Sequence, residues 1–161
     1  MSNVFVTVGT HKQPFDRLPK KIDSLKTGDK FFVQSGNCGY RPQNVEYSQF
    51  LSPAEVRGKT RWADIIVSHC GAGSIINALS NRKALILIPR LKKFNEHTDD
   101  HQLELARALE KEGKAIVIYS VDRLPEALEK ARDFRPDAAR NRAGLVKAIN
   151  NYLGSLEKEG N

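Results

Sequence analysis

The feature that most constrains the fold of this chain is residues 65–79, where an apolar run is followed by a glycine-containing turn and then by a helical pattern. This order predicts a buried strand, a tight turn and a helix. Gly71 and Gly73 allow the turn to bend sharply or to approach a ligand closely, and unpaired N–H groups start the helix. Because the helix dipole adds positive charge there, and His69 and Ser74 can donate hydrogen bonds, the turn suits a phosphate group.

A second apolar run, residues 84–88, predicts a neighbouring strand that is closed by Pro89 and Arg90. The polar loop that follows leads to residues 98–102, at the head of another expected helix. In open α/β sheets, ligands bind beyond the carboxyl ends of the strands. Polar residues that follow these two strands are therefore the first candidates for a binding site.

The rest of the chain continues the same alternation. Further strands are expected at residues 4–8, 30–34, 45–48 and 115–119, and further helices at residues 15–26, 52–60, 98–112, 122–132 and 137–156. Ser52 and Glu55 form a capping box around Pro53, which predicts a helix start, and Thr98 is expected to cap another helix. The central strands are apolar without alternation, as is typical when helices cover both faces of a sheet. We therefore predict an α/β fold with a doubly wound, mostly parallel, Rossmann-like sheet.

The length of 161 residues predicts one domain over residues 1–161, with the last few residues frayed. No apolar run approaches the ~20 residues needed to cross a bilayer, and the first residues predict a strand rather than a signal peptide. The two cysteines, Cys38 and Cys70, make neither a disulfide framework nor a metal cluster. A cytosolic location is expected, and Cys70 is interpreted as a small turn residue.

The charge balance predicts attraction to an anionic partner. Lysine and arginine number 26 against 19 acidic residues, which gives a formal net charge of +7. Nucleic acid, an anionic membrane surface and a diphosphate ligand would all be attracted, and a generally basic, solvated surface is the alternative. Nucleic-acid binding is disfavoured, because the basic residues are dispersed and the aromatic content of 7% includes no stacking cluster.

Residues 6–18, 68–74 and 96–102 resemble the C-terminal, donor-binding domain of family 28 glycosyltransferases. More narrowly, they are similar to small stand-alone subunits of that family. These are the catalytic subunit of the two-part enzyme that adds the second GlcNAc to dolichol-linked sugar, and bacterial exopolysaccharide subunits that pair with a membrane-bound partner. The similarity extends from residue 4 to about residue 117. It implies one Rossmann-like half of a GT-B glycosyltransferase.

The resemblance implies roles for individual residues. The diphosphate is expected to contact Gly9, Thr10, His69, Gly71, Gly73 and Ser74, with His69 and Ser74 stabilising the leaving group. Independently of the resemblance, His11 follows the first glycine loop and is expected either to face the diphosphate or the partner or to be a surface histidine. Phe50 and Leu51 map to the segment that reads uracil, and Asp100, His101 and Gln102 map to the cluster that contacts the sugar hydroxyls.

One position departs from the family pattern. The family typically has an acidic residue three positions after the serine, where it accepts hydrogen bonds from the ribose, and this chain has Asn77 there. An amide oxygen can accept one such bond, but without the charge assistance of a carboxylate.

The resemblance also implies a division of labour. Family enzymes have a second Rossmann-like domain that supplies the acceptor site, the membrane contact and usually the general base. The expected function is therefore the donor-binding subunit of an inverting glycosyltransferase that uses a UDP-sugar, such as UDP-GlcNAc, and no cofactor. A membrane-anchored partner would hold a lipid-linked sugar acceptor and would recruit the chain to the cytoplasmic face of the membrane.

Two other functions remain as alternatives. A non-catalytic subunit that enhances a glycosyltransferase is favoured by Asn77. A dinucleotide-dependent oxidoreductase is disfavoured, because Ile76 stands where the third glycine of the fingerprint belongs and no ribose-binding acid follows the next strand.

The loop before residue 102 also permits a metal site. His97 and His101 are four residues apart, a spacing found in metal ligands, but Thr98 and the two aspartates after it are also explained as a helix cap and first-turn acids. The resemblance implies no metal. Arg90, Lys92 and Lys93 are interpreted as a solvated loop, and contact with a phosphate or a membrane is the alternative.

Overall fold

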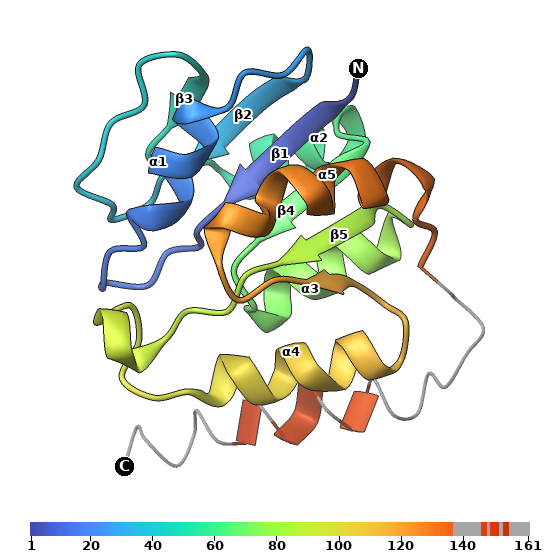
Figure 1. The fold of residues 1–161 in the computed structure, drawn as a ribbon. Coiled ribbons are helices and arrows are strands. Elements are labelled where there is room, and N and C mark those ends of the chain that lie inside the picture. The colour runs from blue at the N-terminus through green and yellow to red at the C-terminus, as the bar shows by residue number, and fades with distance from the viewer. Residues whose placement is uncertain (137–145, 148, 152, 155–161) are drawn as a thin grey trace.

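The computed structural model describes residues 1–136, 146–147, 149–151 and 153–154, and Figure 1 shows the arrangement of its helices and strands. The strands are β1 (Asn3–Thr7), β2 (Lys30–Gln34), β3 (Glu46–Ser48), β4 (Ile65–Ser68), β5 (Ala84–Leu87) and β6 (Ile116–Val117). The helices are α1 (Arg17–Ser24), α2 (Pro53–Trp62), α3 (Ala72–Ser80), α4 (His101–Lys111) and α5 (Leu124–Asp133), with short 3₁₀ turns η1 (Lys92–Phe94) and η2 (Val121–Arg123).

The six strands form one sheet in the order β3-β2-β1-β4-β5-β6. Each neighbouring pair is parallel, with Val6 opposite Val33 on one side of β1 and opposite Val67 on the other. This is the strand order of the doubly wound Rossmann fold. The predicted fold class is therefore confirmed.

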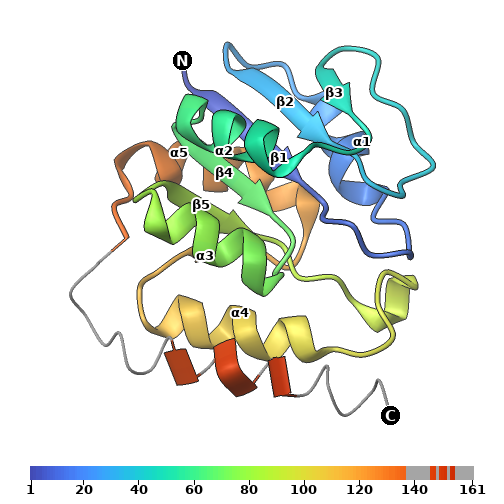
Figure 2. The same cartoon turned by 180° about the vertical axis from the view of Figure 1, so that it is seen from behind.

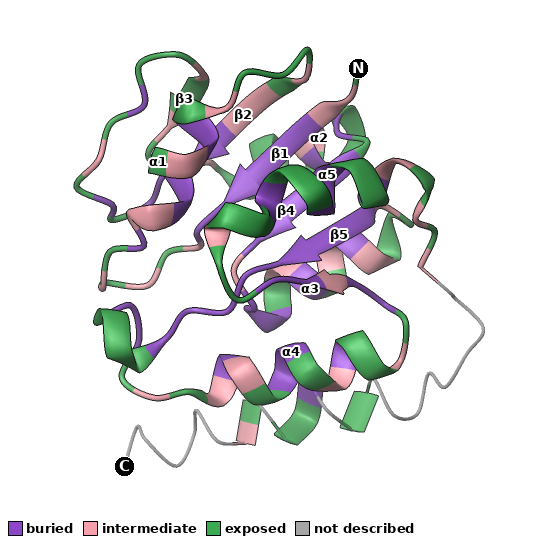
Figure 3. Ribbon diagram, in the orientation of Figure 1, coloured by how far each residue is buried: buried purple, intermediate pink, exposed green. Residues whose placement is uncertain are grey.

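Helices cover both faces of the sheet, as Figures 1 and 2 show from opposite sides. Val4 and Val6 of β1 pack with Leu18 and Ile22 of α1 and with the apolar side of α5. Phe5, between them on β1, packs in a second cluster with residues of α3 and α4. Successive side chains of a strand point to opposite faces, so each central strand needs apolar residues throughout. Figure 3 shows these strands buried.

The fold places two strand-to-helix turns side by side. Strands β1 and β4 are neighbours, with Thr7 opposite Ser68 at their carboxyl ends. The chain then leaves β1 toward α1 on one face and leaves β4 toward α3 on the other. This divergence is the topological switch point, where open α/β sheets bind their ligands.

Local capping explains two helix starts, one as expected and one not. The Ser52 hydroxyl accepts from the backbone N–H of Glu55, and the Glu55 carboxylate accepts from that of Ser52, so the capping box is confirmed. The Thr98 cap is wrong, because α4 begins at His101 and the Thr98 hydroxyl bonds to Asp99 instead. The Asp99 carboxylate accepts from the backbone N–H of His101, which turns the chain into the helix without Thr98.

The expected helix over residues 137–156 falls partly outside the described residues. Residues 137–145, 148, 152 and 155–161, which include the end expected to fray, are not described, whereas the described residues between 146 and 154 are helical. Ile149 packs in the same apolar cluster as α3 and α4. Within the described part of the chain, no helix combines the length and apolar character required to cross a bilayer.

Candidate functional site

A pocket of about 600 Å³ lies at the switch point, beyond the carboxyl ends of β1 and β4. This volume is in the range of small-molecule sites. The pocket brings together ten of the candidate residues, namely Gly9, Thr10, His11, Leu51, His69, Gly71, Gly73, Ser74, Asn77 and Gln102. They come from four separate parts of the chain, which only the fold makes adjacent.

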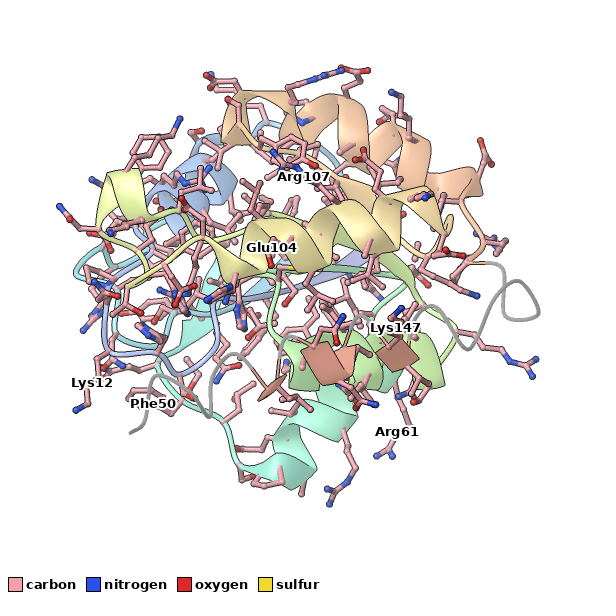
Figure 4. All side chains as sticks on the ribbon, turned by 90° about the horizontal axis from the view of Figure 1, so that it is seen from below. Lys12, Phe50, Arg61, Glu104, Arg107 and Lys147 are labelled. Atoms are coloured by element: carbon pink, nitrogen blue, oxygen red, sulfur yellow. The ribbon has the colours of Figure 1, made fainter. Side chains whose placement is uncertain are left out.

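Three candidates do not line this pocket. The Phe50 side chain is 48% exposed, and Figure 4 shows it extending outward at the edge of the molecule. The Asp100 carboxylate accepts a hydrogen bond of 3.0 Å from the backbone N–H of Lys92, and His101 Nδ1 lies 3.8 Å from the Glu104 carboxylate. Because α4 begins later than expected, Asp100 and His101 point toward η1 and along the helix rather than toward the pocket.

The His69 imidazole lies in a slot between two glycines. A Cβ atom added at Gly9 or at Gly71 would collide with the His69 ring, and Gly9 has a φ of +74°, which glycine adopts most readily. A Cβ added at Gly73 would meet no protein atom within 4 Å. Gly9 and Gly71 therefore make room for His69, whereas the free space at Gly73 remains available to a ligand.

The slot keeps His69 neutral. Burial, followed by the positive charge of Arg90 and the neighbouring His97 and His11, lowers the pKa of His69 from 6.5 to about 3. His69 therefore faces an arriving ligand as a neutral hydrogen-bonding group.

This low pKa predicts acid sensitivity of the fold. In unfolded chains His69 takes up a proton below about pH 6.5, whereas the folded protein resists protonation until about pH 3. Acid therefore favours the unfolded state, and His69 alone is expected to lower the free energy of unfolding by about 2 kcal/mol between about pH 7 and about pH 5. Urea titrations at both pH values test this. A His69→Asn variant that keeps the full wild-type loss would contradict it.

A stacked pair of imidazoles forms one wall of the pocket. The rings of His11 and His97 are stacked, with centroids 4.6 Å apart and planes inclined by 25°. The Nδ1 atom of His11 accepts from the backbone N–H of Gln13 at 3.2 Å. Burial lowers the pKa of His11, as do His97 and Arg90. An anionic ligand would reverse this effect, because it favours protonated imidazoles.

The sequence suggests a role for His97 only as a metal ligand together with His101, but the structure gives the two residues different surroundings. His97 Nδ1 lies 3.3 Å from the Asp99 carboxylate, and its ring lines the pocket beside His11. In the part of the chain that the structure describes, no group of three or more His, Cys, Asp or Glu residues is placed to hold a metal ion.

The floor of the pocket contains two residues that sequence reasoning missed. The Thr7 hydroxyl at the end of β1 donates to the Gln34 side-chain oxygen at the end of β2 over 2.8 Å, and it accepts from the backbone N–H of Gly9 over 3.2 Å. Both residues line the pocket. Their position as the last residues of adjacent parallel strands was the signal that would have identified them.

Asn77 reaches the pocket from α3 and links it to α2. Its Nδ2 atom donates to the Thr60 hydroxyl over 2.6 Å, and Thr60 donates in turn to the Val56 carbonyl. The Asn77 amide is thus held in place by α2. Its oxygen is its only acceptor for a ligand hydroxyl.

Arg90 is not part of a solvated loop, which corrects the expectation for this residue. It is 1% exposed, and its guanidinium donates to the carbonyls of Val8, Gln13 and Glu96. The Glu96 carboxylate in turn pairs with Arg17 at 2.8 Å. Arg90 therefore ties the loop after β1 to the loop after β5 and places a positive charge beneath the pocket. Lys92 and Lys93 are exposed, as expected.

Cys70, in the glycine-rich turn, is fully buried. Burial raises the pKa of its thiol, so the thiolate is disfavoured. Its side chain packs with Ala72 and Ile75 of α3, which agrees with its interpretation as a small turn residue.

Comparisons with known proteins agree with this architecture. The profile of the glycosyltransferase family 28 C-terminal domain matches residues 3–151. The chain is 33% identical over 127 residues to the UDP-N-acetylglucosamine transferase subunit ALG13 of Homo sapiens, covering 70% of this chain and 11% of the human protein. It is 32% identical over 134 residues to the subunit of the same name from Cryptococcus neoformans, covering 78% of this chain and 64% of the relative.

Comparison with solved structures shows a similar fold. The crystal structure of Acinetobacter baumannii MurG superposes with a TM-score of 0.55 at 18% identity, covering 93% of this chain and 44% of that one. The chain therefore spans less than two thirds of the length of these relatives. The profile match over most of the chain, together with the sheet order and the pocket at its switch point, shows that this chain belongs to glycosyltransferase family 28 and corresponds to its C-terminal domain.

Proposed function

We propose that this chain is the donor-binding subunit of a two-component inverting glycosyltransferase, and that its pocket holds UDP-GlcNAc or a closely related UDP-sugar. The observation that carries the proposal is the convergence of hydrogen-bond donors at the switch point. The Gly9 loop, the first turn of α3, His69 and Ser74 all border one pocket. The named activity of the ALG13 relatives, UDP-N-acetylglucosamine transfer, supports this donor.

The diphosphate would lie between the Gly9 loop and the start of α3. There the unpaired N–H groups of the first helical turn and the positive end of the helix dipole favour an anion. When an acceptor hydroxyl attacks the anomeric carbon, the bond to the diphosphate oxygen breaks and negative charge grows on the departing UDP. Donors that are already in place stabilise that charge without reorganisation.

The nucleoside would extend toward α2. This end of the pocket is lined by Leu51, Pro53 and Val56, an apolar surface suited to the uracil ring, with Asn77 beside it for the ribose hydroxyls. Leu51 thus keeps its proposed role. Phe50 is proposed to contribute only through its backbone, because its side chain extends outward.

Asn77 provides a test of this orientation. An Asn77→Ala variant is expected to weaken UDP binding about tenfold, because the ribose loses a hydrogen-bond partner in a desolvated pocket. Binding of inorganic pyrophosphate should stay within about twofold of wild type. Calorimetry with both ligands measures the difference, and Asn150→Ala, on an exposed helical residue, is the matched control. Equal losses for both ligands would contradict the placement of the ribose.

The acceptor half of the reaction would come from a partner protein. We propose a membrane-anchored subunit that holds a lipid-linked sugar, supplies the general base and recruits this chain to the cytoplasmic face of the membrane. The name of the ALG13 relatives, which describes a transferase subunit, supports such a division. The net charge of +7 suits an anionic membrane surface or a lipid diphosphate.

The first experiment is calorimetric titration of the purified chain with UDP, UDP-GlcNAc, UDP-galactose, UDP-glucuronate and NAD. We expect preferential binding of a UDP-sugar that is weakened in Ser74→Ala and unchanged in Ser24→Ala, a control at the exposed end of α1. Binding of NAD in preference to UDP would overturn the proposal. Sugar transfer to a lipid acceptor by this chain alone would contradict the divided site.

A second candidate function is a non-catalytic subunit that enhances a partner glycosyltransferase. The specific observation in its favour is the Asn77 amide, which donates to Thr60 and offers the ribose no charged acceptor. The same titration separates the two functions, because an enhancer would fail to bind any UDP-sugar while remaining folded.

A further inference from the structure

The side-chain amide of Gln102 has a fixed orientation at the base of the pocket. Two backbone N–H groups, those of Cys70 and Arg90, converge on one atom of this amide at 3.2 Å and 3.0 Å. Two donors require an acceptor, so this atom is the oxygen Oε1. Turning the amide over would place its NH₂ group against these two N–H donors, and at 2% exposure no solvent would compensate for the loss. Its NH₂ group must therefore face the other way.

The NH₂ group of Gln102 faces His69. Its Nε2 atom lies 3.3 Å from His69 Nδ1. An amide NH₂ group can only donate, so Nδ1 must accept, and a neutral imidazole that accepts at Nδ1 carries its proton on Nε2. No described residue pairs with His69 Nε2, which lies on the Gly9 side of the ring at the pocket.

We propose that Gln102 is a positioning residue that holds His69 in the Nε2–H tautomer, so that the imidazole presents an N–H donor to the diphosphate. This inference rests on the proposed function, since it names how that site binds its anion. The amide oxygen already accepts from two backbone groups, so only the second hydrogen of the NH₂ group is left for the expected contact to a sugar hydroxyl.

The charges around His69 explain why the tautomer matters. Arg90, His97 and His11 are the titratable or charged groups that face it, and together with burial they disfavour a second proton on the ring. A neutral imidazole has one donor and one acceptor nitrogen. In the opposite tautomer, the Nε2 lone pair would face the phosphate oxygens and repel them. A neutral ring thus depends on Gln102 to select the nitrogen that donates.

The direct test is the ¹⁵N NMR spectrum of the ligand-free protein. The chain contains four histidines, so single substitutions assign their signals. We expect His69 to show a protonated Nε2 and an unprotonated Nδ1 near neutral pH. A protonated Nδ1 with a bare Nε2 would overturn the proposal, whether or not the protein binds UDP. This measurement needs no variant at position 102.

The functional test is Gln102→Glu. One carboxylate oxygen can still accept from Cys70 and Arg90, but the other now accepts a hydrogen bond from His69 Nδ1–H, which reverses the tautomer of a neutral ring. We expect UDP-sugar affinity to fall about tenfold at about pH 8. The affinity should recover as the pH falls, because a doubly protonated imidazolium again carries an Nε2–H donor. Gln49→Glu, on an exposed loop residue, controls for the added charge.

The outcomes separate this inference from the proposed function. A wild-type protein that shows the Nε2–H tautomer but binds no UDP-sugar would refute the function, and the role of the tautomer with it. A wild-type protein that binds UDP-sugar while Gln102→Glu binds equally well at high pH would refute only the positioning role. Loss and acid recovery in Gln102→Glu, absent in Gln49→Glu, would establish that role.

Discussion

Replacing Gly71 with alanine is expected to destabilise the fold by about 2 kcal/mol and to lower UDP affinity by at least about tenfold. The added Cβ would collide with Cε1 of the His69 ring, and Gly9 also lies close to this Nε2–Cε1 edge of the ring. Backbone strain plays no part, because Gly71 has a φ of −93°, which alanine adopts readily. The variant therefore tests only the space that the His69 ring requires. Urea unfolding measures the loss of stability, and calorimetry measures the loss of UDP affinity.

Gly73→Ala is the matched variant. Gly73 lies two residues further on, in the first turn of α3, and a Cβ there meets no protein atom within 4 Å. Its stability should equal or exceed wild type, since alanine is the better helix former by about 1 kcal/mol. UDP binding should still weaken, because the methyl group occupies space at the pocket. Equal destabilisation by the two alanines would contradict the distinct roles assigned to these glycines.

Replacing Arg90 with methionine is expected to destabilise the protein by about 4 kcal/mol, a large fraction of the net stability of a domain. Methionine fills much of the same volume but donates no hydrogen bond. The carbonyls of Val8, Gln13 and Glu96 would then lose the donor that satisfies them in the interior. The loop after β1 would lose its connection to the loop after β5, so nucleotide binding should also weaken.

Urea unfolding measures this loss, and Lys93→Met provides the comparison because Lys93 is exposed two residues beyond the buried Leu91. We expect Lys93→Met to change stability by less than about 0.5 kcal/mol. In Arg90→Met, the removal of the guanidinium charge should also raise the pKa of His69 and of His11, which NMR titration would detect. A loss of less than about 1 kcal/mol would show that Arg90 does not hold the two loops together.

The elements with strong local signals were predicted well. The capping box of Ser52 and Glu55 predicts α2 because both partners lie within one helical turn, and the structure contains both hydrogen bonds. Thr98 also resembles a cap in sequence, but α4 begins at His101. The difference arises from tertiary contacts, since Asp100 is drawn toward the Lys92 backbone and Asp99 toward that of His101.

The site was also predicted only in part, because local patterns identify some of its residues and tertiary contacts bring in the others. Residues of the turn at 69–74 were identified because strand, glycines and helix are contiguous there. Thr7 and Gln34 were missed, because their hydrogen bond depends on β1 and β2 being neighbours. Asp100 and His101 were assigned to the pocket by resemblance, yet the late start of α4 turns them away from it.

The sequence by itself determined the succession of strands and helices and the location of the glycine turn, since these follow from the period of the apolar residues and from backbone chemistry within a few positions. Only the tertiary structure decided that Arg90 is a buried anchor rather than a surface charge, and that the side chain of Gln102 contacts His69. Both outcomes depend on residues 33 to 82 positions away in the chain. Long-range packing, and not local pattern, determines which polar groups find partners when they are removed from water.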